Sequence, residues 1–263
     1  MSAAVAHAGR VPAVAAQLAL RSLLLVTRVP AAFIPAVVFP LFLIVAFSGA
    51  FSALTALPSF PTDQVLNWYV PLAIVQGSAF IGVGTGLGTT RDIETGFYDR
   101  LLLAPTPRIG LVFGPSLGAA TRALLPFTVV LAVGFLGGVR LDGALGVVTL
   151  FVSAAGTCVF HAFWCLGIAY RAKSQRAAPI MQLGVFLTLF LATAQVPLAA
   201  MTGWLHDVAR LNPMTNLLRL ARVGFVGGDG VTCAECGGCL LALAIGVGLA
   251  LLWALRGFRS LVP

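Results

Sequence analysis

The chain has 263 residues, of which 59% are hydrophobic and only 9% carry a charge. Because soluble domains carry about 25% charged residues, this composition excludes an ordinary soluble protein and indicates a multi-pass protein of the cell membrane. The formal net charge of +8 does not predict nucleic-acid binding, since the basic residues are dispersed and include a single lysine, Lys173. The long, continuous apolar runs predict helices, because β-barrel strands alternate in polarity.

The first apolar stretch, residues 10–28, is interrupted by polar side chains at Arg10, Gln17, Arg21 and Arg28. A stretch of this kind is better suited to the membrane interface than to a crossing. We therefore predict an N-terminal amphipathic interfacial helix that leads into the first membrane span.

Six further stretches are apolar over about the 20 residues that a helical crossing needs. With this number of spans, residues 1–263 are predicted to form a single all-α integral membrane domain, with no room for a large soluble domain. The six predicted transmembrane helices are residues 31–52, 67–90, 110–137, 144–169, 179–200 and 238–255.

The distribution of basic residues predicts the orientation of these spans. Cytoplasmic loops carry an excess of Lys and Arg, and most of the 16 basic residues fall on one side if both termini are cytoplasmic. An even number of spans agrees with this N-in/C-in arrangement. The exceptions are Arg140, Arg210, Arg219 and Arg222 outside, and Arg122 within a span.

Residues 201–237 form the longest segment outside the predicted spans. Parts of it alternate between apolar and charged side chains at helical spacing, so we predict short amphipathic helices at the outer interface. The apolar character of residues 185–200 leaves a second arrangement open. In that arrangement, residues 185–237 include a re-entrant hairpin instead of a complete fifth span.

The densest cluster of charges lies in residues 89–108, TTRDIETGFYDRLLLAPTPR. It holds Asp92, Glu94 and Asp99, which are three of only eight acids in the chain. One interpretation is a solvated loop whose local ion pairs contribute little. The clustering favours the other interpretation, a short charged helix at the cytoplasmic face to which a soluble partner docks.

This segment resembles the cytoplasmic signature of type-2 ATP-binding-cassette (ABC) exporter permeases, including the daunorubicin-resistance-type drug exporters. The Gly of that pattern, the acid three residues later, the Leu pair and the closing Pro and Arg are all present. Phe97 and Tyr98 depart from its Thr-Leu, and Asp92-Ile93 replaces its acid-Arg pair. The residues that the resemblance assigns to docking of the ATPase, within a coupling segment over residues 91–108, are Arg91, Asp92, Glu94, Gly96, Asp99, Arg100, Leu101, Leu102, Pro105 and Arg108.

An outer-face segment of the same family, a Trp-Leu followed by Asn-Pro and an Arg, is also similar to part of this chain. Its counterparts are Trp204, Asn212, Pro213 and either Arg219 or Arg222. Asn-Pro alone is an ordinary turn signal. The two motifs nevertheless occur in the expected order among six spans and an interfacial helix, so the resemblance extends over nearly the whole layout.

The resemblance implies a transport subunit and not an enzyme: the permease of an ATP-driven exporter, paired with a second identical or different permease subunit in membrane lipid. A separate nucleotide-binding ABC ATPase subunit would hold ATP and magnesium, and no cofactor is expected in this chain. The sequence agrees, because it contains no G-x-x-x-x-G-K-[ST] phosphate-binding loop. The few charges within the spans favour a hydrophobic or amphipathic substrate, such as a drug, an antibiotic or a lipid.

Two other functions remain open on the sequence. A polysaccharide-export permease would share this layout, and a cavity lined with aromatic side chains that stack on sugars would favour it. A secondary transporter belongs to a different class and would need an acid inside the membrane for ion coupling. All eight acids of the chain fall in or beside the predicted loops.

Several polar and small residues inside the predicted spans admit a functional or a structural interpretation. Intramembrane polar groups are costly and are therefore functional candidates, although each could instead make a contact between helices. These candidates are Arg122, His161, Gln76 and Gln182. Alternate glycines in the second span lack the βαβ context of a dinucleotide fingerprint, so we predict that they allow close helix packing. They are Gly82, Gly84, Gly86 and Gly88.

Cys233, Cys236 and Cys239 form a C-x2-C-x2-C pattern. Such spacing can begin a metal site, but a fourth ligand is missing nearby, so no metal is predicted. A disulfide between two of the three cysteines and reduced thiols both remain open.

Overall fold

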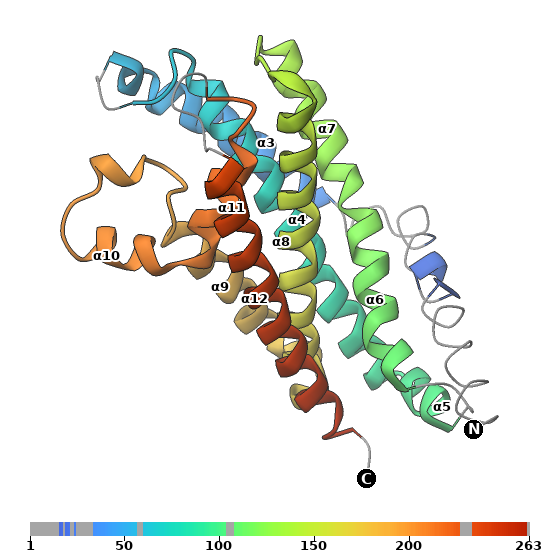
Figure 1. The fold of residues 1–263 in the computed structure, drawn as a ribbon. Helices are drawn as coiled ribbons and strands as arrows, with labels where there is room; N and C mark the ends of the chain where they lie inside the picture. The colour runs from blue at the N-terminus through green and yellow to red at the C-terminus, as the bar shows by residue number, and fades with distance from the viewer. Residues whose placement is uncertain are drawn as a thin grey trace.

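The computed structural model describes residues 16–17, 19–21, 24, 34–56, 60–103, 108–226 and 233–261. All regular elements within these residues are helices (Figure 1), so the predicted all-α fold is confirmed. The interfacial helix predicted over residues 10–28 lies mostly outside the described residues. The elements are α3 (Ile34–Ala50), η2 (Ser52–Ala56), α4 (Val65–Glu94), α5 (Phe97–Leu103), α6 (Arg108–Arg122), α7 (Leu124–Leu136), α8 (Gly143–Ala172), η3 (Gln175–Ala177), α9 (Ala178–Phe190), η4 (Leu198–Ala200), α10 (Trp204–Leu211), α11 (Pro213–Ala221) and α12 (Cys233–Phe258).

Four helical stretches of the described chain are long and apolar enough to cross a membrane. They are Val65–Glu94 (α4), Arg108–Leu136 (α6 with α7), Gly143–Ala172 (α8) and Cys236–Phe258 (within α12). These stretches agree with the second, third, fourth and sixth predicted spans. The apolar helix α3 has 17 residues, or about 26 Å at 1.5 Å per residue, which is slightly less than the roughly 30 Å of a bilayer core.

The fifth predicted span, residues 179–200, is wrong as a single helix, because α9 ends at Phe190. Residues 191–197 are irregular, and the chain continues through η4, α10 and α11 before α12 begins. The segment is therefore interrupted, and the re-entrant hairpin considered for residues 185–237 stays a prediction.

The third span is divided into α6 and α7 at Ala123. Pro126 lies three residues beyond this position. A proline ring inside a helix clashes with the carbonyl four residues earlier, here that of Arg122, and removes the hydrogen bond to it. The proline thus accounts for two helices where the apolar run alone predicts one.

The helices α4 and α8 pack against each other, and α4 is the most buried of the four spans. A Cβ added at Gly82 would lie 2.7 Å from Cβ of His161, and one at Gly86 would lie 2.6 Å from Cβ of Cys165. Only glycine permits this approach. Nothing lies within 4 Å of the corresponding positions at Gly84 and Gly88, so the packing interpretation is confirmed for the first pair and wrong for the second.

We expect Gly86→Val to destabilise the protein by about 1–3 kcal/mol, the usual cost of forcing extra atoms into a packed interior. The matched control is Gly88→Val in the same helix, which meets open space. Thermal unfolding of the detergent-purified chain measures both changes. Equal shifts in Tm for the two variants would mean that helix propensity, and not packing against α8, sets the requirement for glycine at position 86.

The helix ends gather into two groups at opposite ends of the bundle. One group, which we call the α5 end, contains α5 together with the ends of α4, α8 and α12 at Glu94, Ala172 and Phe258 (Figure 1). At the opposite end, the amide of Asp142 donates to the carbonyl of Gly224 at 2.7 Å. This contact joins the start of α8 to the chain that follows α11.

Candidate functional site

The coupling segment predicted over residues 91–108 begins within the last turn of α4, which ends at Glu94, and a sharp turn follows. Thr95 closes this helix, because its amide and its hydroxyl both donate to the carbonyl of Arg91, at 3.0 and 2.9 Å. Gly96 follows with φ of +71°, a left-handed conformation that favours glycine. The turn lets the chain leave α4 and enter α5 within two residues.

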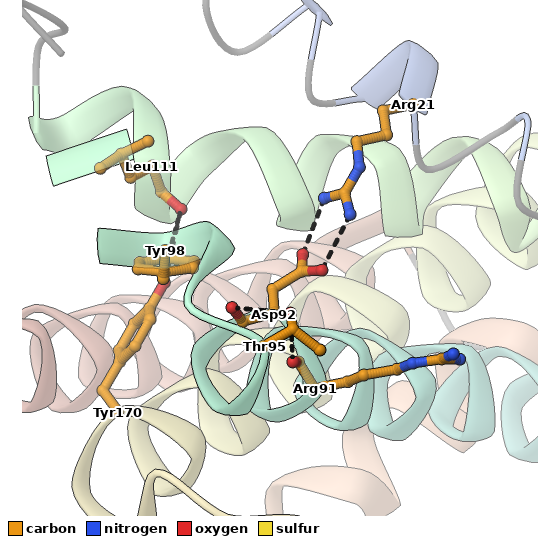
Figure 2. A network of polar contacts seen from close by, with 7 residues as sticks. All are labelled: Arg21, Arg91, Asp92, Thr95, Tyr98, Leu111 and Tyr170. Atoms are coloured by element: carbon orange, nitrogen blue, oxygen red, sulfur yellow. Dashed lines mark hydrogen bonds and ion pairs between the residues drawn. The ribbon is translucent and has the colours of Figure 1, made fainter. Parts of the chain in front are cut away.

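The short helix α5 is fixed to the bundle by a buried tyrosine. The hydroxyl of Tyr98 donates to the carbonyl of Leu111 in α6 at 3.1 Å and lies 3.0 Å from the hydroxyl of Tyr170 in α8 (Figure 2). Burial raises the pKa of Tyr98, so its hydroxyl stays neutral and keeps its proton. Leu101 and Leu102 pack against the same cluster, which means that the predicted Leu pair attaches α5 to the bundle.

Asp92 forms a bidentate ion pair with Arg21, with N–O distances of 2.7 and 2.8 Å (Figure 2). The same guanidinium lies 4.2 Å from the ring centroid of Phe97 at the start of α5. The hydrogen bonds that the guanidinium donates to Asp92 raise the pKa of Arg21. The acid is therefore occupied within the chain, and it connects the N-terminal segment to the end of α4.

Glu94 binds the connection between α8 and α9. Its carboxylate accepts from the hydroxyl of Ser174 at 2.9 Å and from the amide and side chain of Gln175 at 2.9 and 3.0 Å. Close by, the ammonium of Lys173 donates to the carbonyl of Ser260 at 3.4 Å. The ends of α4, α8 and α12 and the start of α9 are thus held together at the α5 end.

The outward face of α5 is formed by Asp99, Arg100 and Leu103, which are all exposed. Leu103 is 87% exposed, so this face also presents a large apolar side chain. Figure 2 shows that the side chain of Arg91 is directed away from the polar network around Asp92. Of the predicted docking residues, Arg108 begins α6, and Pro105 lies outside the described residues.

The second predicted motif lies at the interrupted segment. Asn212 accepts from the amide of Met214 at 2.9 Å and so caps α11, and it donates to the carbonyl of Thr188 in α9 at 2.8 Å. Pro213 is the first residue of α11, as is common for proline. Trp204, which begins α10, and Arg219 are both exposed. Asn212 and Pro213 therefore have structural roles here.

Arg222, at the end of α11, is only 4% exposed. Its guanidinium donates to the carbonyls of Thr193 and Ala194 at 2.8 and 3.1 Å and lies 3.5 Å from the ring centroid of Trp68. The hydroxyl of Tyr69 donates to the next carbonyl, that of Gln195, at 2.9 Å. Backbone that leaves a helix within a membrane protein needs such partners, and side chains of α4 and α11 supply them.

The intramembrane candidates mostly make contacts between helices. Arg122 donates to the carbonyl of Gly118 at 3.1 Å and to the hydroxyl of Thr85 in α4 at 2.8 Å. Nδ1 of His161 donates to the carbonyl of Thr157 at 2.9 Å, and its Nε2 lies 3.1 Å from the hydroxyl of Thr188 in α9. The threonine partners were not identified in the sequence, because a lone Thr in an apolar run gives no signal.

The two glutamine candidates differ in environment. Gln76 is buried, and its Oε1 has no hydrogen-bond partner among the described residues. Gln182 is exposed on α9. The two residues therefore do not form one polar lining together.

Cys236 is a free thiol in α12, and Cys239 is buried in the same helix. The side chain of Cys233 lies outside the described part of the chain. Within that part, no three His, Cys, Asp or Glu side chains are grouped so that they could hold a metal ion.

Long apolar helices and a polar, folded segment at one end define a multi-pass membrane protein with a structured loop face. Sequence comparisons identify a family within this class of membrane proteins. Residues 15–226 match the family described as ABC-2 type transporter, so the chain belongs to that family. It is accordingly a permease subunit of an ABC transporter, has a transport role rather than a catalytic one, and resides in the cell membrane.

Two relatives illustrate the family. The daunorubicin resistance ABC transporter permease protein DrrB1 of Streptomyces coeruleorubidus is 27% identical over 205 residues, which cover 77% of this chain and 71% of the relative. The transport permease ycf38 of Porphyra purpurea is 28% identical over 202 residues, which cover 74% of this chain and 68% of the relative.

Proposed function

We propose that this permease exports a hydrophobic or amphipathic substrate, such as a drug, an antibiotic or a lipid, from the cytoplasm or the inner leaflet. A separate ABC ATPase subunit binds ATP and magnesium and drives transport. A second permease subunit, either a copy of this chain or a different one, completes the pathway. Two findings support it, which are membership of the ABC-2 type transporter family and the geometry of the α5 end.

The observation that carries the proposal is the difference between the inner and outer faces of α5. Its inner face is fixed to α6 and α8 through Tyr98, while Asp99, Arg100 and Leu103 face outward. A helix that is rigidly attached and also presents charged and apolar side chains is suited to receive a soluble partner. The acids Asp92 and Glu94 are bound within the chain, by Arg21 and Ser174, and so hold the segments next to this helix in place.

The orientation follows from the charges at the α5 end. The described basic residues of the cytoplasmic set predicted from the sequence lie there, in α5, at the ends of the long helices and in the segments beside them. An excess of Lys and Arg marks cytoplasmic loops, so we place the α5 end in the cytoplasm, where an ATPase is available. These residues are Arg21, Arg91, Arg100, Arg108, Arg171, Lys173, Arg176, Arg256 and Arg259.

A hydrophobic or amphipathic substrate is supported by two observations. The relative from Streptomyces coeruleorubidus is named for resistance to daunorubicin. A cavity of about 290 Å³ between α8 and α12 is lined mainly by aliphatic side chains, and its described lining residues include none of the aromatic side chains that would favour a polysaccharide. Family membership supports ATP-driven transport over the alternative of a secondary transporter.

The structure suggests how a movement of α5 reaches the membrane. Displacement of α5 by the ATPase acts on α8 through the Tyr98–Tyr170 contact. It acts on α9 through Glu94, which binds the connection that precedes this helix. Because α9 ends in the interrupted segment held by Arg222, the movement extends to the opposite half of the bundle.

Reversal of the two charges on the outer face of α5, Asp99→Lys with Arg100→Glu, tests the docking surface. We expect at least a tenfold loss of co-purification with the candidate ATPase, because like charges opposed across an interface cost several kcal/mol. We also expect loss of permease-dependent ATP hydrolysis, with and without added daunorubicin. The matched control is Asp207→Lys on α10, an exposed acid away from the α5 end.

Retention of the complex and of its ATP hydrolysis after the α5 reversal would refute docking at this face. Reversal of Asp92 and Glu94 is a separate case, since both acids hold parts of the chain together. Those variants are expected to weaken coupling by loosening α5 and the connection to α9. A complex that hydrolyses ATP but shows no response to daunorubicin would redirect the substrate proposal while leaving the docking proposal intact.

A further inference from the structure

A groove lies between α6 and α12 at the α5 end, and the outward face of α5 proposed for docking does not include it. This groove encloses about 470 Å³. Most of its lining is apolar and includes Ile109 and Phe113 from α6 and Leu251 and Leu255 from α12. Its remaining lining consists of charged side chains at one end.

The charged end of the groove is formed by Arg108 and Arg259. Both side chains are exposed, and neither has a hydrogen-bond or ion-pair partner within the described part of the chain. Among the described residues, no acid lines the groove. Two guanidinium groups at one end of an apolar channel are therefore available to an anion that also carries a hydrophobic part.

The apolar part of the groove continues along the outer surfaces of two spans. Ile109 and Phe113 are 55% and 38% exposed, and Leu252, next to the groove on α12, is 52% exposed. Because α6 and α12 belong to membrane-crossing stretches, this surface meets acyl chains. The arginines lie where these stretches end, at the level that lipid headgroups occupy.

We propose that the groove binds one anionic phospholipid, whose phosphate is held by Arg108 and Arg259 and whose acyl chain lies over Phe113 and Leu251. Guanidinium groups bind phosphate through strong, charge-assisted hydrogen bonds, and basic pockets between membrane helices suit anionic headgroups. In the orientation proposed above, this lipid belongs to the inner leaflet. Only the assignment of the lipid to the inner leaflet rests on the proposed orientation.

Charge distinguishes the lipid from other occupants of the groove. A second copy of the chain, packed symmetrically through this surface, would bring the same two arginines of each copy together, and none of the described lining residues is an acid that could compensate them. A soluble ATPase could reach the arginines but not the apolar length that runs along α6 and α12. An anionic phospholipid satisfies both parts.

The test uses the full chain purified in detergent and incubated with vesicles of phosphatidylglycerol or of phosphatidylcholine. After gel filtration, mass spectrometry counts the lipid molecules retained by each chain, and thermal unfolding measures whether phosphatidylglycerol raises Tm. We expect retention of phosphatidylglycerol and little retention of phosphatidylcholine. For Arg259→Gln, we expect about a fivefold loss of retained phosphatidylglycerol, the effect of one arginine near a lipid surface.

Two matched controls separate the groove from general surface charge and hydrophobicity. Arg256→Gln removes the same charge one turn earlier on α12, from an exposed side chain outside the groove. Leu251→Trp fills the apolar part without any change in charge, and Leu252→Trp is its exposed control. We expect Arg259→Gln and Leu251→Trp to lose phosphatidylglycerol, while Arg256→Gln and Leu252→Trp retain it.

Several outcomes would overturn the lipid site. These are equal retention of the two lipids, equal loss in Arg256→Gln and Arg259→Gln, or unchanged retention in Leu251→Trp. An oligomer that dissociates in Leu251→Trp without a change in lipid retention would instead identify a second copy as the occupant. Arg259 lies outside the coupling segment, so co-purification of the ATPase with Arg259→Gln tests the docking proposal independently.

Discussion

Replacement of Arg222 with leucine is expected to lower the free energy of unfolding by about 3 kcal/mol. The substitution removes the donors that hold the carbonyls of Thr193 and Ala194, and each buried acceptor left without a partner costs roughly 1–3 kcal/mol. The side chain also lies against Trp68, so this contact is lost too. Denaturant unfolding of the purified chain, followed by tryptophan fluorescence, measures the change.

The control for Arg222 is Arg210→Leu, which removes the same charge from an exposed position on α10. Arg222→Lys keeps the charge but loses the planar fork that reaches two carbonyls at once, so we expect an intermediate loss of stability. If Arg222→Leu and Arg210→Leu unfolded at the same denaturant concentration, the buried guanidinium would not be what holds the interrupted segment.

Removal of the Tyr98 side chain in Tyr98→Ala should detach α5 from the bundle. We expect a destabilisation of about 3 kcal/mol, the scale of large-to-small substitutions at buried aromatic positions. In Tyr98→Phe, the ring stays and only the hydrogen bonds to Leu111 and Tyr170 are lost, at a cost of about 1 kcal/mol. Thermal unfolding of the permease and ATP hydrolysis by the assembled transporter are the two readouts.

Leu103→Ala separates attachment of α5 from docking of the ATPase. Leu103 is on the same helix but is exposed, so this variant should keep its stability while its binding to the ATPase weakens. Tyr98→Phe should show the opposite pattern, with binding kept and the coupling of hydrolysis to transport reduced. If both variants lowered binding equally and left Tm unchanged, Tyr98 would not be the anchor of α5.

The residues that the sequence identified correctly are those whose signal is local. A run of apolar side chains long enough to cross a bilayer is visible without any knowledge of its neighbours, and α4, α8 and α12 occupy the runs that predicted them. The charged segment after α4 was also visible, because acids are scarce in this chain. Its docking role remains a prediction.

The partners of those charged side chains could not be predicted from the residues of the segment alone. Asp92 pairs with Arg21, 71 positions away, and Tyr98 meets Tyr170, 72 positions away. Tyr98 first stood out as a departure from the family pattern, yet it is the side chain that fixes α5. Contacts at such separation depend on how the helices pack, and residue types within one segment do not specify them.

Composition by itself determined that this chain is a helical membrane protein with a polar segment at one face, because the transfer of long apolar runs into lipid dominates all local preferences. Only the tertiary structure decided that the fifth predicted span stops at Phe190. Residues 191–197 look apolar enough to continue the helix. They leave it because Arg222 and Tyr69, from distant parts of the chain, bind the carbonyls that a helix would otherwise have to satisfy.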